Sequence, residues 1–262
     1  MAENRKTAIS WVDANRILIR GYRVEELIGR VSWGEAVGLL LLGDVPDERT
    51  AKMIEAILVA VIDHGVSPPS TVAAMTAVNT GASLSASVAA GLLTINRFHG
   101  GAIEDCMQTL EEAVEIISVE GLNTAQAAER IVVEAKAQGE RIHGFGHRFH
   151  GADPRTARLF ELARELGIAD EYVEMAEAIE SALATSSGRV LPINADGAIA
   201  ALLCEMKFQK EMANGLFMIA RVCGLVARVT EEQTRNKPMK AVNPKEYEYD
   251  GAPERKLERN QE

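Results

Sequence analysis

Glycine, proline and helix-capping residues interrupt this sequence at short intervals, and the stretches between them have the apolar spacing of helices. Ser32 and Glu35 form a capping box ahead of an apolar run that stops at Gly43. Asp47 predicts the start of a longer helix that runs to Gly65. Further helices are predicted over residues 103–120, 124–137, 154–166, 169–185, 195–208 and 213–232. The fold is therefore predicted to be all-α.

Three segments are predicted to differ from the regular amphipathic helices. β-prone runs flank Asp13-Ala14-Asn15 between Thr7 and Gly21, which predicts a short N-terminal β-hairpin. The segment from Ser70 to Ile95 is rich in Ala, Gly, Ser and Thr and poor in charge, so we expect helix backbones there to approach closely in a buried core. The tail from residue 237 onwards is charged and aperiodic, which favours an arm rather than a packed element.

Composition excludes several classes of protein. The 262 residues, 47% hydrophobic and 25% charged, suit one globular domain with a sizeable core. The net charge of −10 argues against nonspecific binding to nucleic acid or to an anionic membrane. Apolar runs are too short to cross a bilayer, the first residues lack the core of a signal peptide, and the three cysteines lie far apart. We therefore expect a cytoplasmic protein.

Three short motifs place a histidine at a glycine-rich break, where a ligand can approach the backbone closely. They are Asp63-His64-Gly65, His99-Gly100-Gly101-Ala102 and Gly144-Phe145-Gly146-His147. One such histidine alone is more often a helix-end residue, but three in one helical chain indicate a site. His143, His147 and His150 also suggest a metal site, yet the intervening glycines break the helix that would align them, so we expect no metal.

Charged residues add a second signal. Arg141, Arg148, Arg155 and Arg158 cluster around the predicted helix start at Pro154, which indicates a site for a carboxylate or phosphate, although Arg158 and Arg141 also suit a solvated helix face. Asp196 is a candidate base at a predicted helix start, where capping alone would also explain it. Arg221 lies inside the apolar run 216–229, so its burial would require a negative partner from the protein or a ligand.

These motifs, in this order, resemble those of the citrate synthase superfamily. The resemblance covers about residues 20–236 and is strongest to the short branch that contains citryl-CoA lyase and the lyase module of ATP-citrate lyase. It implies a multi-helical fold with a small mobile lobe, about 103–205, and a large lobe formed by 1–102 and 206–236, followed by a tail or arm over 237–262. It also implies a homodimer or higher homo-oligomer.

The resemblance implies a role for each motif. His64, His147, Arg155 and Arg221 would bind the carboxylates and central oxygen of oxaloacetate or of a citryl group. Asp196 would be the carbon base, His99 would stabilise the thioester enolate, and His147 or His64 would take the hydroxyl proton during cleavage. The cofactor-site residues would be Gly144, Phe145, Gly146 and Arg148, which would line a coenzyme A site. Coenzyme A thioesters are then substrates, and no permanently bound cofactor is expected.

The sequence departs from the synthase pattern at two points. The loop from His147 to Arg155 is one residue shorter, as in the lyase-like branch, and Lys237-Pro238 stands where synthases place an arginine before proline. We therefore expect a citryl-CoA lyase that releases acetyl-CoA and oxaloacetate. The alternatives are a citrate or 2-methylcitrate synthase, which would use the same residues in reverse, and a noncatalytic regulatory protein that binds acyl-CoA.

Overall fold

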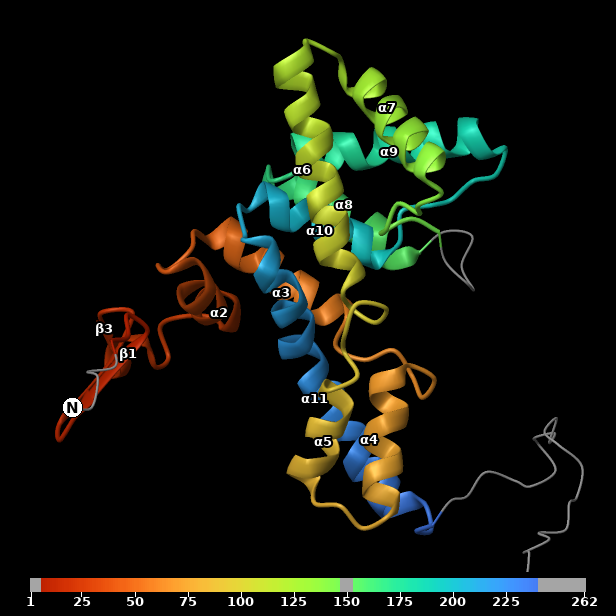
Figure 1. Ribbon diagram of the computed structural model, residues 1–262. Coiled ribbons are helices and arrows are strands. Elements are labelled where there is room, and N and C mark those ends of the chain that lie inside the picture. The colour runs from red at the N-terminus through yellow and green to blue at the C-terminus, as the bar shows by residue number, and fades with distance from the viewer. Residues whose placement is uncertain (1–5, 147–152, 240–262) are drawn as a thin grey trace, which may run out of the picture.

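The computed structural model describes residues 6–146 and 153–239, and it confirms the all-α fold with a small N-terminal sheet (Figure 1). The first helix, α1 (Val24–Leu27), is a single turn, and α2 (Trp33–Leu42) and α3 (Glu48–Ala60) follow it. The remaining elements are α4 (Pro69–Asn79), α5 (Leu84–Leu92), α6 (Ala102–Glu120), α7 (Thr124–Gln138), α8 (Pro154–Leu166), α9 (Glu171–Ser187), α10 (Ala195–Glu205), the short 3-10 turn η1 (Lys210–Met212) and α11 (Ala213–Arg235).

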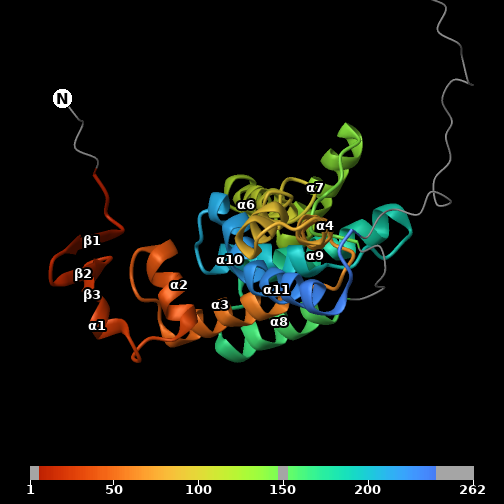
Figure 2. The same cartoon turned by 90° about the horizontal axis from the view of Figure 1, so that it is seen from below.

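The predicted hairpin is present and gains a third strand. β1 (Ser10–Asp13), β2 (Arg16–Ile19) and β3 (Tyr22–Arg23) form an antiparallel sheet in that order, with Trp11 opposite Leu18. The sheet and α2 extend to one side of the other helices in both views (Figures 1 and 2). Two polar contacts connect it to the region of α2, because Arg20 donates to the carbonyl of Leu40 at 2.8 Å and Tyr22 donates to Asp44 at 2.6 Å.

Local caps set most helix boundaries as predicted. Ser32 and Glu35 form the expected capping box of α2, which ends at Gly43 with a φ of 100°. Asp47 caps α3, but this helix ends at Ala60 rather than near Gly65. The backbone after Ala60 turns toward α11 instead, where the carbonyl of Val61 accepts a hydrogen bond from Arg221. A tertiary contact therefore ends a helix that the local sequence would have continued.

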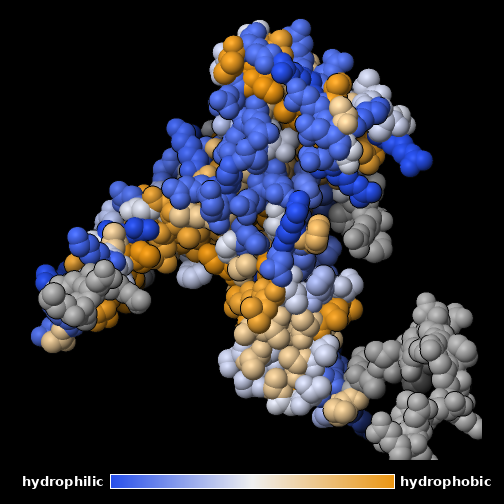
Figure 3. All heavy atoms as spheres, in the orientation of Figure 1, coloured by the Kyte–Doolittle hydropathy of each residue, from blue (hydrophilic) through white to orange (hydrophobic). Residues whose placement is uncertain are grey.

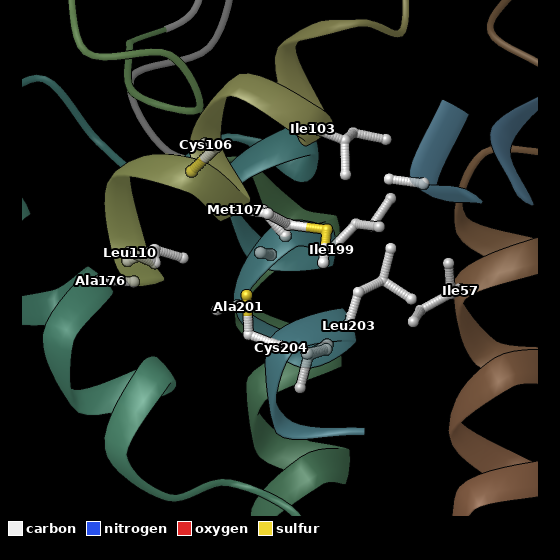
Figure 4. Packing of buried hydrophobic residues seen from close by; sticks show 14 of the residues in the cluster. Ile57, Ile103, Cys106, Met107, Leu110, Ala176, Ile199, Ala201, Leu203 and Cys204 are labelled. Carbon is white, nitrogen blue, oxygen red and sulfur yellow. The ribbon is translucent and has the colours of Figure 1, made fainter. Parts of the chain in front are cut away.

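The main core lies between α10, α6, α9 and α3. Figure 4 shows Ile199 and Leu203 of α10 facing Met107 of α6, with Ile57 of α3 closing the opposite side. These four side chains are at most 1% exposed. Since α10 is buried from Gly197 to Cys204 and packs against α6, α9 and α8, its first turn, which carries Asp196, is anchored in the core.

The helices α4 and α5 lie side by side against the C-terminal half of α11 (Figure 1). The sequence predicted close helix packing here, and Gly91 on α5 does approach the carbonyl of Ser70, since a Cβ at position 91 would lie 2.8 Å from that oxygen. The expectation of a buried core is wrong, because much of this pair is exposed and only a small cluster is buried beneath it, formed by Ala74, Val78, Leu225 and Val229.

Residues Lys210–Arg235 form the one helical stretch, within the described residues, that is long and apolar enough to cross a membrane. Its environment is that of a core helix, because α11 packs against α3, α4, α5 and α6. Arg221 is buried midway along it and is 2% exposed.

Candidate active site

A cavity of about 380 Å³ collects the predicted catalytic and substrate-binding residues that lie within the described part of the chain. Its walls come from both lobes proposed from the sequence. One side is formed by the loop before α4, the His99 loop and α11, and the other by Gly146, the start of α8 and the start of α10. The residues that line it include His64, His99, Arg155, Asp196 and Arg221.

His64 is positioned by a loop that α11 anchors. The carboxylate of Asp63 accepts two hydrogen bonds from Arg228, at 2.5 Å and 3.2 Å, and one from the N–H of Gly65 at 3.1 Å. The hydrogen bond from Arg228 is the main reason that the pKa of Asp63 lies below its ordinary value. Gly224 allows α11 this close, since a Cβ there would lie 2.2 Å from the carbonyl oxygen of Ile62. Sequence reasoning did not identify Arg228.

His99 is partly buried beside a serine and an aromatic ring. Its Nε2 atom lies 2.9 Å from the hydroxyl of Ser70, and its ring meets that of Phe217 edge to face with centroids 5.7 Å apart. Burial lowers the pKa of His99 below its ordinary value, and the positive charge of Arg221 lowers it further. A neutral imidazole keeps one N–H, which can donate a hydrogen bond to a developing enolate oxygen.

Arg221 has the contacts expected of a residue that binds an anion. Its Nε donates to the carbonyl of Val61 at 3.1 Å, and the guanidinium lies over the ring of Phe217 at 4.8 Å. Its Nη1 atom is buried without a hydrogen-bond partner, and burial lowers the pKa of the group. A buried guanidinium with an unsatisfied nitrogen at the wall of a cavity is suited to bind a carboxylate there.

Asp196 lies in the first turn of α10 and faces the same cavity. Asn194 caps this helix, because its side-chain oxygen accepts from the N–H groups of Asp196 and Gly197. Desolvation raises the pKa of Asp196, the charge of Asp153 raises it further, and Arg155 and Arg221 oppose the rise. A carboxylate with a raised pKa is a stronger base once ionised, which suits proton removal from carbon.

Arg155 reaches the cavity from the first turn of α8. Pro154 occupies the start of this helix, as the sequence predicted, and the side chain of Asp153 caps it. The side chain of Arg155 also pairs with Asp153, with Nη2 2.7 Å from Oδ2. Arg158 of the predicted cluster behaves differently, because it pairs with Glu161 and Glu165 on the exposed surface. The alternative of a solvated helix face is thus correct for Arg158.

The loop at residues 144–146 is bound tightly to the start of α10. The N–H of Asn194 donates to the carbonyl of Gly144 at 3.0 Å, and the side-chain amide of Asn194 donates to the carbonyl of Gly146 at 2.8 Å. Glycine is required at Gly197, because a Cβ there would lie 2.3 Å from the oxygen of Gly144. Gly144 itself has a φ of 85°, a backbone conformation that favours glycine.

A second, larger cavity of about 680 Å³ lies between α7, α9 and this loop. Phe145 and Gly146 line it, together with the cationic side chains of Lys136 and Arg141. Gly146 borders both cavities, so they share a wall. Lys136 was not identified from the sequence. The signal that could have identified it is a lysine in the last turn of a predicted helix, shortly before a glycine-rich loop.

Some predicted residues lie outside the described ranges. His147, Arg148 and His150 fall in the undescribed segment 147–152, and residues 240–262 of the tail are also outside. Of the three histidines considered for a metal site, His143 is described and lies 3.5 Å from Asp105. Within the described ranges, no group of three or more His, Cys, Asp or Glu side chains is arranged to hold a metal ion.

Fold and site together define an all-α protein with an acid–base site for an anionic substrate, and comparison with known proteins identifies the family. The sequence model of the family described as "Citrate synthase, C-terminal domain" matches residues 42–244. The chain therefore belongs to the citrate synthase family.

Two solved structures share the fold along nearly the whole chain. Citryl-CoA lyase from Hydrogenobacter thermophilus is 41% identical, with a TM-score of 0.89 and 97% of each chain covered. ATP citrate lyase from Methanothrix soehngenii, solved with citrate and coenzyme A, is 27% identical with a TM-score of 0.83. The match covers 97% of this chain and 43% of that chain.

Among curated sequences, ATP-citrate synthase beta chain protein 1 of Arabidopsis thaliana is 27% identical over 245 residues. This match covers 87% of the present chain but 37% of the plant protein. The chain thus spans well under half the length of such relatives.

Proposed function

We propose that this protein is a citryl-CoA lyase, which cleaves citryl-CoA into acetyl-CoA and oxaloacetate through a thioester enolate. The observation that carries the proposal is the convergence of a carboxyl base, a neutral histidine and two arginines on one cavity, with Nη1 of Arg221 unsatisfied. The similarity to the citryl-CoA lyase of Hydrogenobacter thermophilus over 97% of both chains supports it.

The chemistry follows from these positions. Arg155 and Arg221 would bind carboxylates of the citryl group, which fixes the scissile carbon–carbon bond relative to Asp196 and His99. His64, or His147 from the undescribed segment, would accept the proton of the tertiary hydroxyl as the bond breaks. His99 would stabilise the enolate oxygen, and protonated Asp196 would then deliver a proton to the enolate carbon to form acetyl-CoA.

The larger cavity is the proposed site of the coenzyme A part of the substrate. Lys136 and Arg141 supply positive charge for phosphates, and Gly146 connects this cavity with the one that holds Asp196. Replacing Lys136 or Arg141 by alanine should raise KM for citryl-CoA several-fold while leaving kcat nearly unchanged. Arg158→Ala is the control, because Arg158 pairs with acids on the exposed surface. Equal KM values in all three variants would contradict this location.

The site also motivates proposals for lobe motion and assembly. Since the smaller cavity has walls from both proposed lobes, the lobe of about 103–205 would close on the substrate, which structures with and without ligand should reveal as a rotation. A homodimer would bury the α4–α5 pair, whose surface is largely uncharged (Figure 3) and exposes Val72, Leu84 and Leu93. Sedimentation analysis tests the dimer, and a monomer at micromolar concentration would contradict it.

The deciding experiment assays both directions with the purified protein. Oxaloacetate released from citryl-CoA is coupled to malate dehydrogenase, and thiol release from acetyl-CoA plus oxaloacetate is followed separately. Cleavage that Asp196→Asn abolishes, with little thiol release, supports the lyase. Sustained thiol release would instead identify a synthase, the second candidate, which the presence of His99 favours. Binding of acyl-CoA without turnover, unaffected by Asp196→Asn, would indicate the noncatalytic alternative.

A further inference from the structure

Asp153, immediately before α8, makes more contacts than a helix cap requires. Its side chain is 1% exposed. Oδ1 accepts hydrogen bonds from the backbone N–H and the Nε of Arg155, both at 3.0 Å, and Oδ2 accepts from Nη2 at 2.7 Å. This fork fixes the plane of the guanidinium at the wall of the smaller cavity.

The same carboxylate reaches the helix that carries the base. The backbone N–H of Ala195, the first residue of α10, faces the Asp153 carboxylate and helps to lower its pKa. A parallel contact lies beside it, since the hydroxyl of Thr156 donates to the carbonyl of Ile193 at 3.0 Å. The first turn of α8 and the first turn of α10 are therefore held together, and Arg155 and Asp196 lie on these two turns.

Another aspartate in this chain shows what capping alone looks like. Asp47 caps α3 through the N–H of Thr50 at 2.8 Å and has an arginine, Arg49, two residues later, as Asp153 has Arg155. The side chain of Asp47, however, is 54% exposed, and its contact with Arg49 is one bond of 3.3 Å. Burial and the bidentate fork with Arg155 are thus features of Asp153 that capping does not explain.

We propose that Asp153 is a positioning residue, which holds the substrate-binding Arg155 and the start of the helix that bears Asp196 as one rigid unit. This inference rests on the proposed function, in which Arg155 binds a substrate carboxylate and Asp196 transfers the proton. Both groups would then keep their relative geometry when the small lobe moves. A displacement of about 1 Å at such a group can reduce rate by roughly 100-fold.

Asp153 also acts on the charge of Asp196. Its negative charge is one cause of the raised pKa of Asp196, and its removal also frees Arg155 to interact with Asp196. Both effects lower the pKa of Asp196. The ionisable groups of the described residues that face Asp196 from the elements around it are Asp153 and Arg155 at α8, Arg221 on α11, Cys106 on α6, and His64 and His99 at the same cavity.

The test compares Asp153→Asn with Asp47→Asn in the full-length chain. Asparagine retains a capping oxygen in both variants, and thermal unfolding of each is measured first, so that a loss of fold is distinguished from a loss of positioning. Three quantities are measured: kcat and KM for citryl-CoA, the dissociation constant for citrate by calorimetry, and the midpoint of Asp196 in a carboxyl carbon-13 NMR titration. The Asp196 resonance is identified by its absence in Asp196→Asn. Asp153→Ala serves if the Asn variant does not fold.

In Asp153→Asn we expect kcat/KM to fall about 100-fold, citrate to bind at least tenfold more weakly, and the Asp196 midpoint to move to lower pH. Asp47→Asn should match the wild type in kcat/KM, in citrate binding and in the Asp196 midpoint. A citrate dissociation constant and an Asp196 midpoint equal to those of the wild type would overturn the positioning role. These two readouts do not require turnover, so an inactive wild-type protein would refute the lyase function without deciding the role of Asp153.

Discussion

The Nε2 atom of His99 lies 2.9 Å from the hydroxyl of Ser70, a fully buried residue in the first turn of α4. A hydroxyl can hydrogen-bond to a neutral imidazole in either direction, so this contact orients the ring without requiring it to be charged. Since His99 is the proposed donor to the enolate oxygen, the orientation of its ring bears directly on the rate.

We therefore expect Ser70→Ala to lower kcat roughly tenfold, because a hydrogen bond of this kind contributes about 0.5–1.5 kcal/mol. KM should change little, since Ser70 orients a catalytic group and leaves both arginines in place. The matched control is Ser87→Ala, another buried serine, whose hydroxyl donates to the carbonyl of Ser83 within α5. Steady-state kinetics of both variants checks the prediction, and equal losses of kcat would contradict it.

Arg221 is expected to matter for binding more than for folding. Replacement of Arg221 by methionine removes a buried guanidinium whose Nη1 has no partner, so the free energy of unfolding without ligand should stay level or rise. Citrate should bind at least about 30-fold more weakly, which corresponds to about 2 kcal/mol. Calorimetry and thermal unfolding, each with and without citrate, measure both effects. Arg164→Met, at a surface pair with Glu177, is the control and should bind citrate normally.

The raised pKa of Asp196 predicts the pH dependence of proton transfer. Exchange of the methyl protons of acetyl-CoA with deuterium requires ionised Asp196, so its rate should rise with pH through a midpoint above the ordinary carboxyl value of 3.8. Cleavage of citryl-CoA uses protonated Asp196 and should decline through the same midpoint. Proton NMR follows the exchange, and Asp196→Asn should reduce it by roughly 100-fold or more. A midpoint at or below 3.8 would be inconsistent with this role.

The raised pKa of Asp196 also predicts how Asp196→Asn changes the free energy of unfolding. Because the folded-state pKa is raised, the stabilisation from protonated Asp196 is complete below the unfolded pKa and is lost as pH rises through the folded pKa. Asparagine mimics the protonated group at every pH. The variant should therefore be more stable than the wild type near pH 7, and the difference should vanish at acid pH. Urea unfolding across this range measures it, and a constant difference would argue against the shift.

Gly197 is expected to be irreplaceable for a steric reason. A Cβ at this position would lie 2.3 Å from the oxygen of Gly144, so Gly197→Ala must displace the loop that borders both cavities. We expect a loss of about 1–3 kcal/mol in the free energy of unfolding and a large loss of activity. Gly215→Ala on α11 is the control, because no atom lies within 4 Å of its Cβ position, and it should be neutral or stabilising by up to about 1 kcal/mol.

The sequence by itself determined most helix boundaries and most residues of the site. The boundaries of α2 and α8 follow from caps that act within a few residues, such as the pairing of Ser32 with Glu35, and such local interactions are legible along the chain. His64, His99, Arg155, Asp196 and Arg221 were recognisable because each belongs to a motif or an anomalous position, such as a charge within an apolar run.

Only the tertiary structure decided which groups hold those residues in place. Arg228 meets Asp63 across 165 positions of sequence, Ser70 meets His99 across 29, and Thr156 meets Ile193 across 37. Their hydrogen bonds depend on how whole helices pack, which no spacing along the chain encodes. The contact of Arg221 with Val61 beyond the end of α3, and the side on which α4 and α5 pack against α11, are likewise set by the tertiary structure.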